Sequence, residues 1–171
     1  RMLVRRKSQV HDRAGIRLDL GDLRLVDGNG QLAADARNPV ADVGGGGISA
    51  NQANHVTIDG NRVYNTSFWN SYQTSAISLF ESANIGGGNN SDGFSFYIRN
   101  NVAWNNKNLV GVVSDGNCII VDSNRHTGYT GATYVSNNLC YANGGRGVHV
   151  FISDNVVAAN NTLVGNLTSS Q

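Results

Sequence analysis

The sequence predicts an all-β fold, a right-handed parallel β-helix (a solenoid) of about five coils in a single domain at 1–171. The first observation is a repeated phrase in which two short strands of alternating apolar residues flank an Asn; it recurs at 23–33, 55–65, 95–105, 133–143 and 156–166. A short strand that opens with Gly or Ala precedes the phrase. A coil repeated with loops of variable length is typical of a solenoid.

The spacing of the two landmarks is the second observation. From Gly15 to Asn29, from Gly47 to Asn61 and from Gly147 to Asn161 the separation is 14 residues each time, whereas successive copies of the Asn lie 32, 40, 37 and 23 residues apart. The third observation is composition, with 21 Gly, 24 Asn and a single Pro, Met and Glu. Turn residues in excess and few helix formers favour many short strands joined by tight corners.

Each coil is expected to hold three short strands. The first strands fall within 14–20, 46–52, 75–81, 115–122 and 146–152. In the last coil Val148 and Val150 point inward, and His149 and Phe151 point outward, because successive strand residues face opposite sides. A second strand begins at Val156, and a third carries Leu163 inward.

The recurring Asn marks the corner between the second and third strands. Its amide can bond the equivalent Asn one coil above and below, which satisfies polar groups that a sharp bend leaves unpaired. The sequence therefore predicts a structural Asn ladder at Asn29, Asn61, Asn101, Asn138 and Asn161.

The two cysteines, Cys118 and Cys140, lie within one coil. Cys140 takes the inward position that Val63 and Ala103 hold in other coils. A buried thiol is favoured over a disulfide on this ground, because unpaired Cys behaves as a small apolar residue in cores.

Inserted segments flank the first strands on both sides. They lie at 81–93 and 122–132 between first and second strands, and at 34–46, 66–75 and 106–117 between a third strand and the next coil. Loops grown on both sides of one face of a rigid scaffold indicate a binding trough.

The outward residues of the first strands form the floor of that trough. One column is Arg17, Ser49, Ser78, Ile120 and His149, and the other is Asp19, Asn51, Phe80, Asp122 and Phe151. A slip of one residue at 117–122 is an alternative, and it would exchange the two faces there. Charged, amide and aromatic groups together favour an extended sugar chain over a small apolar ligand.

The segments 145–166 (GRGVHVFISDNVVAANNTLVGN) and 115–122 (DGNCIIVD) resemble the coils of bacterial secreted members of the pectate-lyase-like superfamily, over about 15–166. The resemblance implies a secreted or periplasmic protein that acts on a polysaccharide. Members include polysaccharide lyases, glycoside hydrolases, epimerases, tailspikes and adhesins. Their lyases use a Lys, Arg or His base, often with Ca²⁺ held by clustered acids.

We expect the site on the last two coils, where ionisable residues are densest. The predicted catalytic residues are His149 as base, Arg146 as carboxylate ligand and Tyr129 as acid. Arg125, also considered as a carboxylate ligand, joins the substrate-binding residues, which are Arg125, His126, Lys107, Asn51, Phe80 and Phe151. Asp122 and Asp115 are candidate Ca²⁺ ligands, although they are about 23 Å apart if the segment is fully extended.

Two functions remain open. The first is a lyase that cleaves an acidic, uronate-containing polysaccharide by β-elimination, and the second is a non-catalytic glycan-binding or structural module. Hydrolysis is weaker because it needs two facing carboxylates, and Asp19 and Asp122 are three coils apart. A net charge of +1 and the lack of a long apolar stretch give no sign of nucleic acid or membrane as a partner. Exposed solenoid ends suggest a fragment or a homo-oligomer that covers them.

Overall fold

The computed structural model describes residues 18–19, 32–34 and 39–169, which form three five-stranded sheets. The first sheet has the order β1 (Leu18–Asp19), β4 (Ile48–Asn51), β7 (Ile77–Phe80), β10 (Ile119–Asp122) and β13 (Val148–Phe151). The second has β2 (Leu32–Ala34), β5 (Val56–Asp59), β8 (Phe96–Arg99), β11 (Thr133–Ser136) and β14 (Val156–Ala159). The third has β3 (Pro39–Val43), β6 (Arg62–Thr66), β9 (Val102–Trp104), β12 (Leu139–Tyr141) and β15 (Thr162–Val164).

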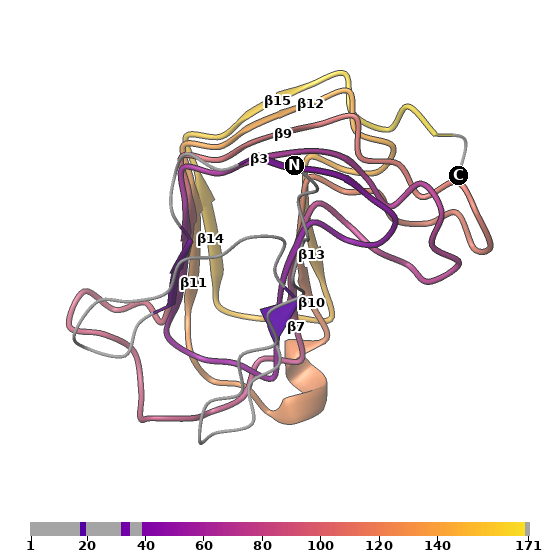
Figure 1. The fold of residues 1–171 in the computed structure, drawn as a ribbon. Helices are drawn as coiled ribbons and strands as arrows, with labels where there is room; N and C mark the ends of the chain where they lie inside the picture. Colours follow the sequence, from indigo (N-terminus) through magenta and orange to yellow (C-terminus); the bar gives the residue numbers. More distant parts are fainter. Residues whose placement is uncertain (1–17, 20–31, 35–38, 170–171) are drawn as a thin grey trace, which may run out of the picture.

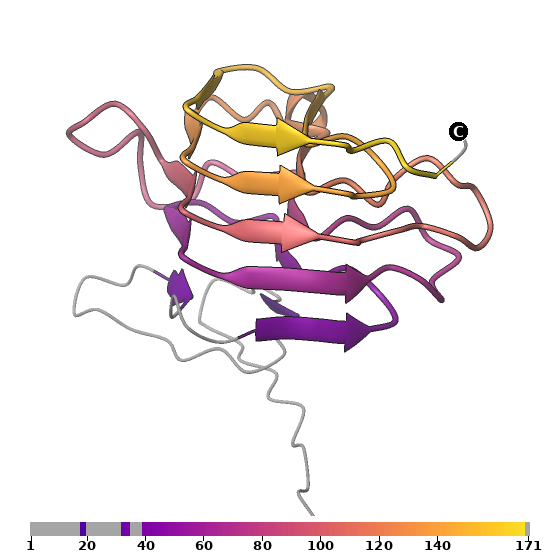
Figure 2. The same cartoon turned by 90° about the horizontal axis from the view of Figure 1, so that it is seen from above.

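The three sheets surround one interior, which Figure 1 shows in a view along the stack. Consecutive strands along the chain belong to different sheets, and we call each set of three a rung, from rung one (β1 to β3) to rung five (β13 to β15). Apart from β1, which pairs antiparallel with β4, the paired strands run parallel. Figure 2 shows the third sheet from the side, with its strands lying side by side. This all-β arrangement fits a parallel β-helix.

Alternating residues fill the interior, as the sequence predicts. On the first sheet Ile77 and Leu79 stack on Ile119 and Val121, and all four are fully buried. The inward positions of the third sheet carry Val63, Ala103 and Cys140, which lie in register. Rung five covers this core on one side, so its own inward residues remain half exposed, Val150 at 44% and Leu163 at 49%. No helix of the described part of the chain is long and apolar enough to cross a membrane.

The corner between the second and third strands repeats the same geometry in rungs two to five. Gly60, Asn100, Asn137 and Asn160 all adopt positive φ, between 55° and 68°. Gly and Asn are the residues that tolerate this left-handed conformation best, which explains their recurrence at the corner.

The Asn that follows this corner forms the predicted ladder. Asn61 donates to Oδ1 of Asn101, Asn101 to Oδ1 of Asn138, and Asn138 to Oδ1 of Asn161, at 2.9–3.0 Å. A second ladder, absent from the sequence prediction, follows the third strand: Thr66, Asn106, Asn143 and Asn166 are linked in the same way. Both ladders bond backbone groups of neighbouring rungs, so the Asn residues stabilise the stack.

Rung one differs from the prediction. β2 pairs with β5 and β3 pairs with β6, so 39–43 is a strand and not part of an inserted loop at 34–46. Asp19 lies opposite Ser49, not beside Asn51, because β1 is antiparallel. The predicted positions of Arg17 and Asn29 fall outside the described residues. The copy of the repeat predicted at 23–33 and the strands observed at 32–34 and 39–43 both have alternating apolar residues. The observed strands are the ones that pair with rung two.

Cys118 and Cys140 form a disulfide with a Cα–Cα distance of 5.7 Å, so the prediction of buried free thiols is wrong. The reason is a contact that recurs in the rungs. The residue just before the first strand faces the inward residue of the third strand: a Cβ at Gly147 would lie 2.8 Å from Leu163, and one at Gly47 would touch Val63. Cys118 and Cys140 occupy these two positions in rung four.

Removal of this disulfide should destabilise the protein markedly. The bond closes a loop with a sequence separation of 22 residues, for which loss of chain entropy in the unfolded state predicts about 3 kcal/mol. We expect the double variant Cys118→Ala/Cys140→Ala to lose about that free energy of unfolding in a urea titration. An unchanged urea midpoint would show that the disulfide contributes nothing to stability.

Candidate functional site

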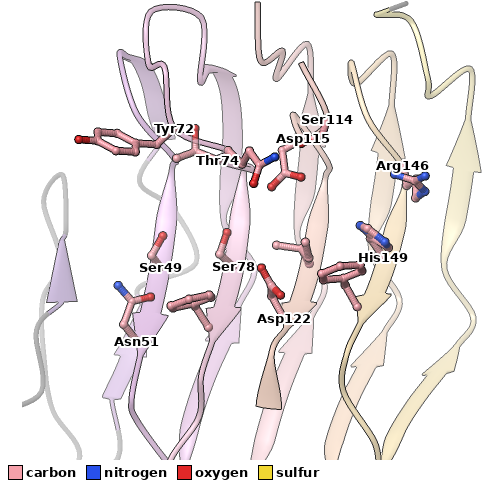
Figure 3. A pocket seen from close by; sticks show the side chains of 14 residues that line it. Ser49, Asn51, Tyr72, Thr74, Ser78, Ser114, Asp115, Asp122, Arg146 and His149 are labelled. Atoms are coloured by element: carbon pink, nitrogen blue, oxygen red, sulfur yellow. The ribbon is translucent and has the colours of Figure 1, made fainter. Parts of the chain in front are cut away.

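A groove of about 850 Å³ lies on the outer face of the first sheet (Figure 3). Its floor is the pair of predicted columns: Ser49, Ser78, Ile120 and His149 are in register, as are Asn51, Phe80, Asp122 and Phe151. All eight line the groove. The alternative register at 117–122 is therefore wrong, because Ile119 and Val121 point into the core.

The groove has one loop wall where the sequence predicts two. Its other lining residues come from the segments that precede the first strands: Tyr72, Gln73, Thr74, Ser114, Asp115 and Arg146. The loops at 81–95 and 123–132, on the opposite side of the sheet, contribute none of the lining. Of the wall residues, Tyr72 (77% exposed), Gln73, Thr74 and Ser114 were not predicted as site residues. Their only signal is their position just ahead of a floor strand.

Asp115 lies in this groove just ahead of Gly116, which has a left-handed backbone conformation and packs closely against neighbouring backbone. Gly116 has a φ of 76°, its N–H donates to the Thr74 carbonyl at 2.8 Å, and a Cβ there would lie 2.7 Å from the backbone nitrogen of Asn108. A positive φ together with so close a backbone approach favours glycine. The extended-chain estimate that separated Asp115 from Asp122 therefore does not apply, and both carboxylates line the same groove.

The two carboxylates differ in their surroundings. Burial, the largest effect, raises the pKa of Asp115, and the charge of Asp122 adds to the rise; a hydrogen bond from Ser75 opposes it. Asp122 accepts a hydrogen bond from the Ser123 hydroxyl at 2.7 Å. Asp115 therefore keeps its proton to higher pH than an exposed aspartic acid.

His149 faces the same groove from rung five. Burial lowers its pKa, and the positive charge of Arg146 lowers it further, against the opposing effect of Asp115 and Asp122. Its Nδ1 is buried and makes no hydrogen bond among the described residues. A neutral imidazole, able to accept a proton, is thus favoured. The backbone N–H of Arg146 donates to Oδ1 of Asn117 at 2.7 Å, which fixes the start of this segment.

Tyr129, predicted as the acid, does not line the groove. It is 7% exposed, its ring packs edge-on against Phe96 in the core, and its hydroxyl donates to Oδ1 of Asn54 at 2.6 Å. Burial raises its pKa to about 12. This placement corrects the prediction, because a residue held inside the core cannot reach a sugar on the outer face of the first sheet.

Three of the predicted substrate-binding residues also lie away from the groove. Arg125 and His126 are exposed on the short 3-10 helix η1 (Asn124–Thr127), and Arg125 pairs with Asp154 at 2.7 Å. Lys107 lies on the β9–β10 loop but does not line the groove. The other three, Asn51, Phe80 and Phe151, do line it.

The described residues include no group of three or more His, Cys, Asp or Glu side chains placed to hold a metal ion. Ca²⁺ takes six to eight oxygen ligands, so Asp115 and Asp122 would need many oxygens from elsewhere. Comparison of the chain with protein-family models, curated proteins and solved structures finds no match.

Proposed function

We propose that this chain is a secreted right-handed parallel β-helix of about five coils, of the pectate-lyase-like kind. In this proposal its groove cleaves an acidic polysaccharide by β-elimination. The observation that carries the proposal is the meeting of His149, Arg146, Asp115 and Asp122 on one open groove. A groove across stacked strands, lined by hydroxyl, amide and aromatic groups, suits a polymer better than a compact ligand.

β-Elimination removes the proton on C5 of a uronate and breaks the C4–O4 bond, which leaves a C4–C5 double bond. His149 takes the C5 proton, because its lowered pKa keeps the imidazole neutral. Arg146 binds the neighbouring carboxylate and stabilises the charge that develops on it. O4 departs with the other part of the chain and needs a proton.

Asp115 supplies that proton in place of Tyr129. It lies in the groove, and burial raises its pKa, so it is the carboxyl group best suited to act as a general acid. Asp122, the second carboxylate, accepts hydrogen bonds from sugar hydroxyls. Its proposed role as a Ca²⁺ ligand remains a prediction, which a chelator tests.

The pH dependence of kcat/KM should be bell-shaped, with its optimum on the acid side of neutrality. As the pH rises, activity first increases when His149 loses its proton, because the pKa of His149 lies below the usual 6.5. Activity then decreases when Asp115 loses its proton, because the pKa of Asp115 lies above the usual 3.8. Because Arg146 helps to lower the His149 pKa, Arg146→Gln should move the acidic limb to higher pH, in whatever activity remains. An unmoved limb would show that His149 is not the titrating base.

The proposal is tested by incubating the protein with pectate, alginate and glycosaminoglycans, with Ca²⁺ or with chelator. The ultraviolet absorbance of the unsaturated uronate is followed. A rise on one polymer establishes a lyase, and loss of the rise with chelator supports a Ca²⁺ requirement. Binding without any cleavage supports instead the non-catalytic glycan-binding module.

Hydrolysis is the second candidate, because Asp115 and Asp122 share the groove and differ in their surroundings. Glycoside hydrolases use such a pair, one carboxyl group protonated and the other ionised. New reducing ends without a rise in ultraviolet absorbance would identify this reaction. Loss of the new reducing ends in both Asp115→Asn and Asp122→Asn would assign it to these two residues.

A further inference from the structure

Charge is distributed unevenly along the groove. Among the described residues, the acidic and basic side chains that line it lie on rungs four and five and their loops: Asp115, Asp122, Arg146 and His149. Rungs two and three, with the loop between them, contribute Ser49, Asn51, Ser78, Gln73 and Thr74 beside the aromatic Tyr72 and Phe80. Within the described residues, Arg146 is the one groove-lining side chain with a permanent positive charge.

The groove is long enough to hold several sugar units, so the positions of its charged residues affect which polymers it binds. Four strands at the usual spacing of parallel β-strands span about 14 Å across the stack, which accommodates a few sugar units. A homopolymer of uronates places a carboxylate on each of these units. Such a chain would lay one carboxylate near the carboxylate of Asp122, where like charges repel. It would lay others over rungs two and three, where no lining residue of the described part of the chain is cationic.

From this asymmetry we infer that the substrate is a heteropolysaccharide in which an uncharged sugar is joined to O4 of each uronate. The inference rests on the proposed lyase function and names its substrate class. The uronate lies over rung five, where Arg146 binds its carboxylate and His149 faces its C5 proton. The uncharged sugar that carries the leaving O4 lies over rungs four and three, beside the acid Asp115.

The lining of rungs two and three suits uncharged sugars. Phe80 and Tyr72 are 39% and 77% exposed, and aromatic faces of this kind stack on the apolar faces of pyranose rings. Ser49 and Asn51 offer hydroxyl and amide groups to sugar hydroxyls or to an N-acetyl group. Since none of these groups neutralises a carboxylate, this half of the groove selects against charge.

The test compares two classes of polymer at equal concentration of uronate. Hyaluronan and unsulfated chondroitin alternate a uronate with an N-acetylhexosamine joined to its O4, whereas polygalacturonate and polyguluronate consist of uronates alone. We expect kcat/KM for at least one alternating polymer to exceed that for both homopolymers by at least about tenfold. Equal or faster cleavage of a homopolymer would overturn the inference while it supports the lyase function.

Binding is measured on the same polymers by gel retardation, so that a lack of turnover still gives an answer. Retardation by the alternating polymers and not by the homopolymers, without cleavage, supports the inferred ligand class and contradicts the lyase function. Preferential retardation by a homopolymer overturns the inference, and retardation by neither class overturns both.

A charge placed in the uncharged half should reverse the preference. Ser49→Lys adds a cation to the floor at rung two, and we expect it to raise relative affinity for polygalacturonate several-fold. Thr57→Lys is the matched control, because Thr57 lies on β5, outside the groove. An equal gain in both variants would assign the effect to net charge alone and overturn the role of the groove.

Discussion

Replacement of His149 by alanine is expected to lower kcat/KM on the cleaved polysaccharide by about 10²–10⁴-fold, the usual contribution of a general base. The loss follows from the position of the imidazole on the groove floor, next to Arg146 and two carboxylates. Stability should change little, because His149 is half-buried on the outer face and its Nδ1 makes no hydrogen bond with the residues that the structure describes. Initial rates of absorbance change and the free energy of unfolding are measured on the same preparation.

His126→Ala is the matched control. His126 is exposed on η1 and does not line the groove, so its removal deletes the same chemical group from a surface outside the site. We expect that variant to retain wild-type kcat/KM. Equal losses in the two variants would contradict the assignment of the base, and unfolding of His149→Ala would contradict the outward placement of the side chain.

The fold was predictable wherever a residue lies on a strand with a period of two. The columns from Ser49 to His149 and from Asn51 to Phe151 follow from the alternation within each first strand, with the register left open only at 117–122. Rung one was predicted with the wrong strands, since two adjacent segments carry the same alternation. Only pairing with β5 and β6 separates them.

The site was predictable on strands and not in loops. Tyr129 belongs to a loop without periodicity, and nothing in the sequence shows that its ring enters the core to meet Phe96. Asp115 shows the opposite error. The prediction placed it far from Asp122 by assuming an extended chain, whereas both residues line the groove. Gly116 has a positive φ there, and the presence of a glycine in the sequence does not by itself show which conformation it takes. Contacts between neighbouring rungs decide both cases, and a linear sequence does not state them.

The Asn ladder is expected to have a large effect on stability. Oδ1 of Asn138 accepts hydrogen bonds from the backbone and side-chain nitrogens of Asn101, at 2.9 and 3.0 Å. Its Nδ2 donates to the Ile98 carbonyl and to Oδ1 of Asn161, both at 2.9 Å. Asn138 and Asn101 are 1% exposed, so water cannot replace these bonds. Truncation to alanine leaves the Asn101 N–H buried without this acceptor.

We therefore expect Asn138→Ala to lower the free energy of unfolding by about 3 kcal/mol, the upper end of the cost of unsatisfied buried groups. Urea titrations compare it with Asn51→Ala, which removes the same amide from the exposed outer face of β4 and should cost less than about 0.5 kcal/mol. The contrast isolates burial and hydrogen bonding from the chemistry of the amide. If both variants unfold at the wild-type urea concentration, the ladder does not hold the rungs together, and their stacking depends on apolar packing and backbone pairing.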